Sequence, residues 1–168
     1  MSGDASVKLI ATCRRCEELF SFPSSTLISD FWISDFEWAD DLALTPITGG
    51  CYCGNVRFRA THKPMHQANC HCANCRRAAG AQAVAWITVP QSSFEIEKGK
   101  PKRHRTETGA IRTFCDVCGT SLTYEISNRP GEIDITTGSL DHPEDFQPTK
   151  DVFPDEKLPW VRLVDGKH

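Results

Sequence analysis

Cysteines in three short motifs are the residues of this sequence best suited to chemistry. Thiols this close together in sequence suit one metal ion better than they suit disulfides with one another. The chain holds nine cysteines in all, an odd number, so complete disulfide pairing would leave one over. The spacing therefore predicts metal binding. The seven cysteines concerned are Cys51, Cys53, Cys70, Cys72, Cys75, Cys115 and Cys118.

Four of these cysteines are predicted to close one structural metal site. Cys51 and Cys53 form one pair, Cys115 and Cys118 form another, and a glycine follows each pair. The glycine permits a tight turn that aims main-chain N–H groups at the sulfurs. Structural zinc takes four such ligands tetrahedrally, at about 2.3 Å. Zinc is favoured over an iron–sulfur cluster on frequency, although four thiolates also suit iron, and buried free cysteines are the alternative.

The second motif brings three thiols, Cys70, Cys72 and Cys75, within six residues. All three can reach one ion, and no fourth protein ligand is evident close by in the sequence. Three protein ligands with one exchangeable position are typical of a reactive zinc site. Such a site can bind an incoming thiolate and lower its pKa. The alternative is a second structural zinc, completed by His66, His104 or another residue.

Three polar residues accompany the second motif. His71 lies inside it, and its side chain is expected to point away from the metal, as a surface residue or a residue that supports a ligand. A role as ligand is the alternative. Arg76 and Arg77 follow at once and are candidates to hold a substrate carboxylate. A solvated helical turn beside an anionic site explains the two arginines equally well.

The elements that must position these motifs are mostly strands. Segments that alternate apolar and polar residues, or that are rich in β-branched residues, are typical of strands. From residue 50 onward, the only helical candidate is a turn or two over residues 76–79. The pattern predicts a mainly β fold, an antiparallel sheet or small sandwich with few short helices. The predicted strands cover residues 55–59, 83–89, 94–97, 111–114, 122–126, 132–136 and 160–164.

Composition bounds the class of protein. The chain has 168 residues, 39% of them hydrophobic and 24% charged, as expected for a globular domain with its own core. With a net charge of −3 and no long Lys/Arg block, nucleic acid is not the expected partner. No stretch approaches about 18 apolar residues, so no membrane span is expected. No secretory leader is recognised, and clustered thiols then favour a reducing compartment, the cytoplasm.

Residues 1–46 differ in texture from the rest and are expected to be an extension before a domain at 47–168. Cys13 and Cys16 lie in it as a lone Cys-x-x-Cys pair, open to reading as free thiols or as a metal or redox pair. Apolar residues recur at helical spacing over the acidic segment 27–44. That segment is expected to pack on the protein's own core or on a second copy, which would make a homodimer. A surface for a different partner is the alternative.

The motifs resemble the glutathione-dependent formaldehyde-activating enzyme family, also called the CENP-V/GFA family. The resemblance covers residues 47–164, because three cysteine motifs occur in order with the expected flanks. Gly-Ser-Leu-Asp-His-Pro at 138–143 and Lys-Leu-Pro-Trp at 157–160 also resemble it. The motifs read Gly-Cys-Tyr-Cys-Gly-Asn-Val-Arg-Phe at 50–58, Cys-His-Cys-Ala-Asn-Cys-Arg-Arg at 70–77 and Phe-Cys-Asp-Val-Cys-Gly-Thr-Ser-Leu at 114–122.

The resemblance implies a fold, two metals and an activity. The fold would be Mss4-like, with zinc-clipped turns. One structural zinc would bind at the two cysteine pairs that precede a glycine. A second zinc would bind at the three-cysteine motif, near bound glutathione. The activity would be that of a carbon–sulfur lyase, which condenses a small thiol with formaldehyde or runs the reverse. Residues 148–153 depart from the family, which often has a His-Ile segment there, so a different substrate pocket is expected.

Two other functions compete with this one. The same β fold can serve as a zinc-stabilised binding module without catalysis, because a fold does not dictate a function. Thiol redox chemistry is the third reading, and it predicts loss of zinc and disulfide formation on mild oxidation.

Overall fold

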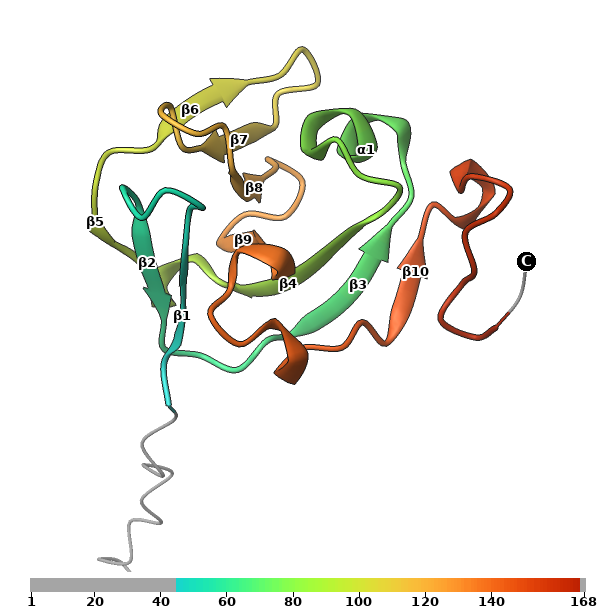
Figure 1. Cartoon of the computed structure of the whole chain (residues 1–168), viewed down its shortest axis with the longest axis horizontal. Coiled ribbons are helices and arrows are strands. Elements are labelled where there is room, and N and C mark those ends of the chain that lie inside the picture. Colours follow the sequence, from blue (N-terminus) through green and yellow to red (C-terminus); the bar gives the residue numbers. More distant parts are fainter. Residues whose placement is uncertain (1–44, 167–168) are drawn as a thin grey trace, which may run out of the picture. The chain divides into compact units, whose positions relative to one another are not determined.

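The computed structural model describes residues 45–166, whose regular structure is mainly β (Figure 1). The mainly β prediction is thereby confirmed. Cys13, Cys16 and the segment 27–44 lie outside the described residues, so the predictions made for them stay predictions.

Two sheets make up this part of the chain. The smaller has the order β1-β2-β5, and all of its pairs are antiparallel. Its strands are β1 (Ile47–Gly50), β2 (Arg57–Ala60) and β5 (Phe94–Lys98). The larger has the order β10-β3-β4-β9-β8-β7-β6 and is antiparallel except for the parallel pair β10–β3. Its strands are β10 (Lys150–Val152), β3 (His66–Cys70), β4 (Val84–Pro90), β9 (Glu132–Thr136), β8 (Ser121–Glu125), β7 (Ile111–Phe114) and β6 (Lys102–Arg105).

Most of the predicted strands are confirmed. The first six correspond to β2, β4, β5, β7, β8 and β9. The predicted closing strand at 160–164 is wrong, because this segment forms turns and irregular structure. Its hydrogen bonds do not go to a neighbouring strand. The Val161 N–H donates to the Leu158 carbonyl within a turn. The Trp160 indole donates to Gln82, and the Val164 N–H donates to Asp151. Four strands, β1, β3, β6 and β10, were not predicted from the pattern. β3, which reads His-Gln-Ala-Asn-Cys, is a strand because of its partners and not because of its own propensity.

Strand β4 serves a different core on each of its faces. Ile87 and Val89 point into a large apolar core that also contains Phe58 of the small sheet. Val84 and Trp86 belong to a separate, smaller cluster with Cys70 and Cys75. Because side chains alternate along a strand, one strand can hold both cores apart. The fold therefore places the two predicted metal sites in different surroundings.

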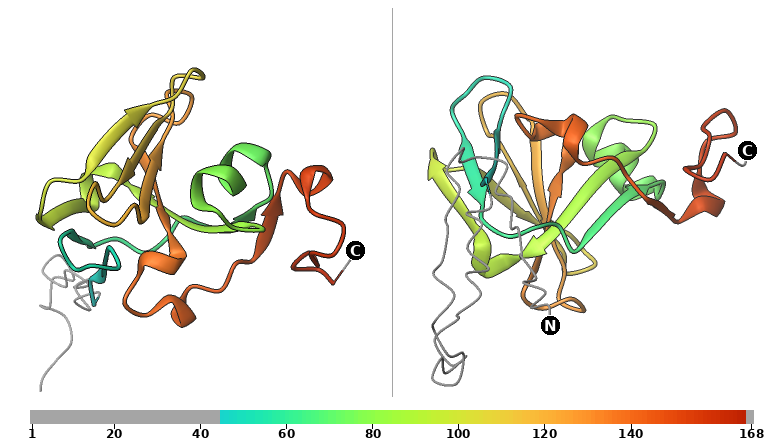
Figure 2. Two further views of the ribbon diagram at one scale, coloured as in Figure 1. Left: turned by 45° about the horizontal axis from the view of Figure 1, so that its top comes forward. Right: turned by 90° about the horizontal axis from the view of Figure 1, so that it is seen from below.

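The helix α1 (Ala73–Ala79) is longer than the predicted turn at 76–79 and carries one cysteine of the second motif. It starts at Cys72, whose sulfur accepts a hydrogen bond from the Cys75 N–H, and it ends at Gly80, whose φ of 63° is the left-handed conformation that glycine tolerates best. Figure 2 shows α1 and the β1–β2 hairpin on opposite sides of the larger sheet. Within residues 45–166 no helix is long and apolar enough to cross a membrane. Short 3-10 turns are η3 (Gln91–Ser93), η4 (Thr137–Ser139), η5 (Pro143–Asp145) and η6 (Pro154–Glu156).

Candidate metal centres

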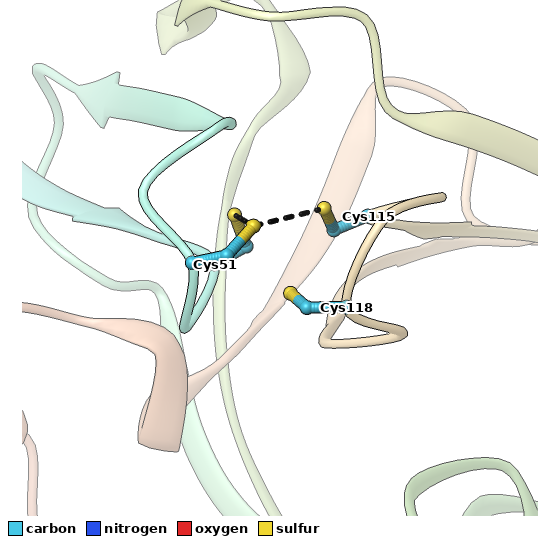
Figure 3. Close-up of side chains that lie close together, drawn as sticks. Cys51, Cys115 and Cys118 are labelled. Atoms are coloured by element: carbon cyan, nitrogen blue, oxygen red, sulfur yellow. Dashed lines mark hydrogen bonds between the residues drawn. The ribbon is translucent and has the colours of Figure 1, made fainter.

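The four cysteines of the first cluster lie together, brought in by two turns that are far apart in sequence (Figure 3). All four sulfurs lie within 4.8 Å of one another. The Sγ atoms of Cys51 and Cys53 are 3.5 Å apart, and those of Cys53 and Cys115 are 3.8 Å apart. Four sulfurs at about 2.3 Å from a tetrahedral zinc lie about 3.8 Å from one another. The donor set and spacing therefore fit such an ion.

The two turns have the conformation predicted from their glycines. Gly54 and Gly119 have φ values of 73° and 77°, in the left-handed region that favours glycine. Each turn is closed by a main-chain bond to a cysteine carbonyl, from Gly54 N–H to Cys51 at 3.0 Å and from Gly119 N–H to Cys115 at 2.9 Å. Glycine thus lets each cysteine pair fold back on itself.

Hydrogen-bond donors surround the sulfurs of the first cluster. The Val56 N–H donates to Cys51 Sγ at 3.2 Å, and the Thr120 hydroxyl lies 3.2 Å from Cys118 Sγ. The hydrogen bonds from Thr120 are the main reason that the pKa of Cys118 falls to about 5. Donors of this kind stabilise thiolates, the form in which cysteine binds a metal.

The second cluster joins the end of β3 to the start of α1. The three sulfurs of Cys70, Cys72 and Cys75 lie within 4.8 Å of one another. Cys70 and Cys75 are buried against Trp86, and Cys72 is half-buried. Among residues 45–166, no fourth His, Cys, Asp or Glu places a ligand atom within that distance of all three sulfurs. The cluster could hold a metal ion with three protein ligands.

The histidines weighed as a fourth ligand do not join the second cluster. His66 begins β3 and is exposed, and His104 is exposed on β6. Neither they nor His71 bring a ring nitrogen into the group of sulfurs. The sequence reading that left His66 or His104 to complete the site is not supported by their positions.

His71 is fully buried beside the second cluster, so the reading of it as a surface residue is wrong. Its Nε2 atom lies 2.7 Å from Oδ1 of Asp151, itself 9% exposed at the side chain. The other carboxylate oxygen of Asp151 accepts the Val164 N–H at 2.7 Å. The His71 main-chain N–H donates to the Val152 carbonyl at 3.0 Å. Asp151 belongs to residues 148–153, the segment that departs from the family pattern, and it ties the cluster to the C-terminal part of the domain.

The two arginines after the motif have different surroundings. Arg76 donates from Nε to the His71 carbonyl at 3.0 Å and from Nη2 to the Glu156 carbonyl at 3.4 Å. Arg77 is exposed. The Glu156 carboxylate accepts the Ala73 N–H at 2.8 Å at the start of α1. Arg76 therefore holds two chain segments together, and a substrate contact by either arginine stays a prediction.

Arg112 is a further residue beside the second cluster that sequence reasoning missed. Its Nη2 atom lies 3.5 Å from Cys75 Sγ, and its guanidinium lies 4.8 Å from the centroid of the Tyr124 ring. The Cys70 thiol and then the Arg112 guanidinium lower the pKa of Cys75 to about 5. Arg112 stood in a predicted strand, but no motif marked it, because only strand pairing shows which cluster it faces.

These features define a class of protein, a mainly β domain with two cysteine clusters that could each hold a metal ion. The family model described as "Glutathione-dependent formaldehyde-activating enzyme" matches residues 46–156. The chain belongs to that family, and the resemblance stated from the motifs is confirmed. The fold is also similar to that of a crystal structure of a Rhodobacter sphaeroides protein, with a TM-score of 0.52 and 21% identity over 62% of this chain and 99% of that chain.

Proposed function

We propose that this protein is a zinc-dependent carbon–sulfur lyase that joins a small thiol such as glutathione to formaldehyde or a related aldehyde, or runs the reverse. The observation that carries the proposal is the second cluster, with three clustered sulfurs and no fourth His, Cys, Asp or Glu ligand among residues 45–166. The name of the family supports glutathione as the thiol and formaldehyde as its partner.

The two clusters would have different roles, one structural and one in the reaction. Cys51, Cys53, Cys115 and Cys118 would hold a structural zinc that clips the domain, proposed to span residues 47–168. Cys70, Cys72 and Cys75 would hold a second zinc. Zinc bound there would lower the pKa of an incoming thiol and keep it as a thiolate near neutral pH. We place the protein in the cytoplasm, where thiols stay reduced.

The reaction itself forms one carbon–sulfur bond and moves one proton from sulfur to oxygen. The substrate sulfur attacks the aldehyde carbon, the carbonyl π electrons move to oxygen, and the proton lost by the thiol ends on that oxygen. The product is an S-hydroxyalkyl thiol. The chain's own residues would position the thiol: Trp86 and Tyr124 form an apolar wall beside the sulfurs, and Arg76 or Arg77 is proposed to hold a substrate carboxylate.

A turnover assay tests the proposal. Zinc-loaded full-length protein, mixed with glutathione and formaldehyde, is expected to form S-hydroxymethylglutathione faster than the uncatalysed reaction, followed by exchange NMR. Cys72→Ser, in the half-buried cysteine of the second cluster, is expected to remove the acceleration. Arg103→Gln, on the exposed face of β6, is the control and is expected to keep it. No acceleration with glutathione or with other thiol and aldehyde pairs would sink the proposal and favour a binding module.

A further inference from the structure

Arg112 stands in a row of side chains that crosses the larger sheet. In the register of the sheet, Arg112 of β7 lies opposite Tyr124 of β8, which lies opposite Asp134 of β9. Asp134 in turn lies opposite Thr88 of β4, two residues from Trp86. Residues directly opposite one another share a face of a sheet. Arg112 is therefore on the Trp86 face, the one that packs against the second cluster.

The nearest carboxylate in this row does not compete for Arg112. Asp134 is buried and receives hydrogen bonds from Arg129 and from the Thr88 hydroxyl, the latter at 2.7 Å. Among residues 45–166, Cys75 Sγ is the one acceptor that the Arg112 side chain contacts. The Tyr124 ring lies under the guanidinium and holds it in place. The charge of Arg112 is thus directed at the sulfurs.

The contact between Arg112 and Cys75 affects the charge balance of the second cluster. Three thiolates around a divalent ion carry a net charge of −1, and a fourth thiolate would raise that to −2. The sulfurs are largely buried, and an uncompensated charge is costly in such a place. The guanidinium offsets one negative charge in both states. Its effect is largest where the fourth ligand is an anion, and a neutral ligand gains much less from it.

We propose that Arg112 selects the charge of the ligand at the second cluster, so that a metal held by Cys70, Cys72 and Cys75 accepts a thiolate in preference to a neutral donor. This rests on the proposed function, because it takes the thiol to bind at that cluster. Arg112 is a positioning residue in this account, since it acts through Cys75 and through the ligand's charge. It also implies that recognition of the thiol does not depend only on its carboxylates.

The test compares two probes in the cobalt-loaded full chain by visible absorption. The probes are 2-mercaptoethanol, which binds as a thiolate and has no carboxylate, and imidazole, which binds neutral. The variants are Arg112→Gln, Arg112→Met, which keeps the stem on Tyr124, and Arg112→Lys, which keeps the charge. Arg103→Gln is the matched control on the neighbouring strand. Cobalt absorption from the first cluster reports in every variant that the fold is intact.

The expected result is selective. Both neutral variants should bind the thiol about 10- to 100-fold more weakly, while their affinity for imidazole stays within about twofold. Arg112→Lys and Arg103→Gln should stay close to the unaltered protein for both probes. Unchanged thiol affinity in a folded neutral variant, or equal weakening for thiol and imidazole, would overturn the role of Arg112. A lack of any thiol response in the unaltered protein would instead overturn the proposed function, and the inference with it.

Discussion

The two cysteine clusters differ in how far apart their cysteines lie along the chain. The first joins turns whose cysteines are 62 residues apart and packs against the large core between the sheets. The second comes from one run of six residues and packs under the opposite face of β4. A metal that closes a long loop contributes directly to folding. A metal held within one short loop is better suited to chemistry, because fewer parts of the fold depend on that metal.

A pair that contains a distant aspartate lies near each cluster, but in different surroundings. Near the first, Arg57 and the Thr48 hydroxyl bind Asp141, and both members of the ion pair are about a third exposed. Near the second, Asp151 binds His71, which is fully buried. Hydrogen bonds to charged groups are worth more when water is excluded. The aspartate pair near the second cluster is therefore shielded from water, and the pair near the first cluster is partly exposed to it.

The largest expected effect separates the two clusters by substitution. Cys115→Ser, at a fully buried cysteine of the first cluster, should cost several kcal/mol and remove cooperative folding, because structural zinc binding can supply about 10 kcal/mol. Cys72→Ser should fold and lose one of two metals per chain. Thermal unfolding followed by circular dichroism, with metal analysis, measures both. A Cys72→Ser protein that is as unstable as Cys115→Ser would remove the distinction between the clusters.

The next largest effect concerns the buried pair of His71 and Asp151. Asp151→Ala should lower the free energy of unfolding by about 2 to 3 kcal/mol, because it leaves His71 and the Val164 N–H without their partner. Asp151→Asn keeps an acceptor and should cost less. Denaturant unfolding measures the loss, and hydrogen exchange should rise in residues 70–76 and at Val164 but not around the first cluster. Equal exchange at both clusters would contradict the local role of Asp151.

The smallest effect concerns the partly exposed ion pair of Arg57 and Asp141. The Arg57 guanidinium, with help from the Thr48 hydroxyl, holds the pKa of Asp141 at about 2, below its usual value. Because the folded-state pKa is lowered, the stabilisation is present above the unfolded-state pKa near 4 and is lost as the pH falls through about 2. Solvent screening keeps it below about 1 kcal/mol.

Asp141→Asn allows the contribution of that ion pair to stability to be measured. The difference in unfolding free energy from the unaltered protein should be constant above about pH 4 and shrink towards pH 2. Loss of metal in acid affects both proteins and cancels in the difference. A difference that grows as the pH falls would contradict the assignment, and a difference as large as that for Asp151→Ala would remove the contrast between exposed and buried support.

The predictability of the fold followed the strength of the local pattern. Segments such as 111–114 and 132–136 were found because apolar and polar residues alternate along each, although both faces of 132–136 are buried. β3 and β10 were missed, since their short polar sequences become strands only by pairing with each other and with β4. The segment 160–164 has a strand-like sequence, but its N–H groups donate to a carbonyl within a turn and to the Asp151 side chain, not to a neighbouring strand.

The cysteine motifs could be recognised from the sequence alone, because close spacing and a following glycine are local properties of the chain. The surroundings of the sulfurs depend instead on the tertiary structure. Arg112 is 37 residues from Cys75, and Asp151 is 80 residues from His71. Strand register and the parallel β10–β3 pair bring them together, and no short motif records either. The surroundings that distinguish the second cluster from the first arise from these long-range contacts.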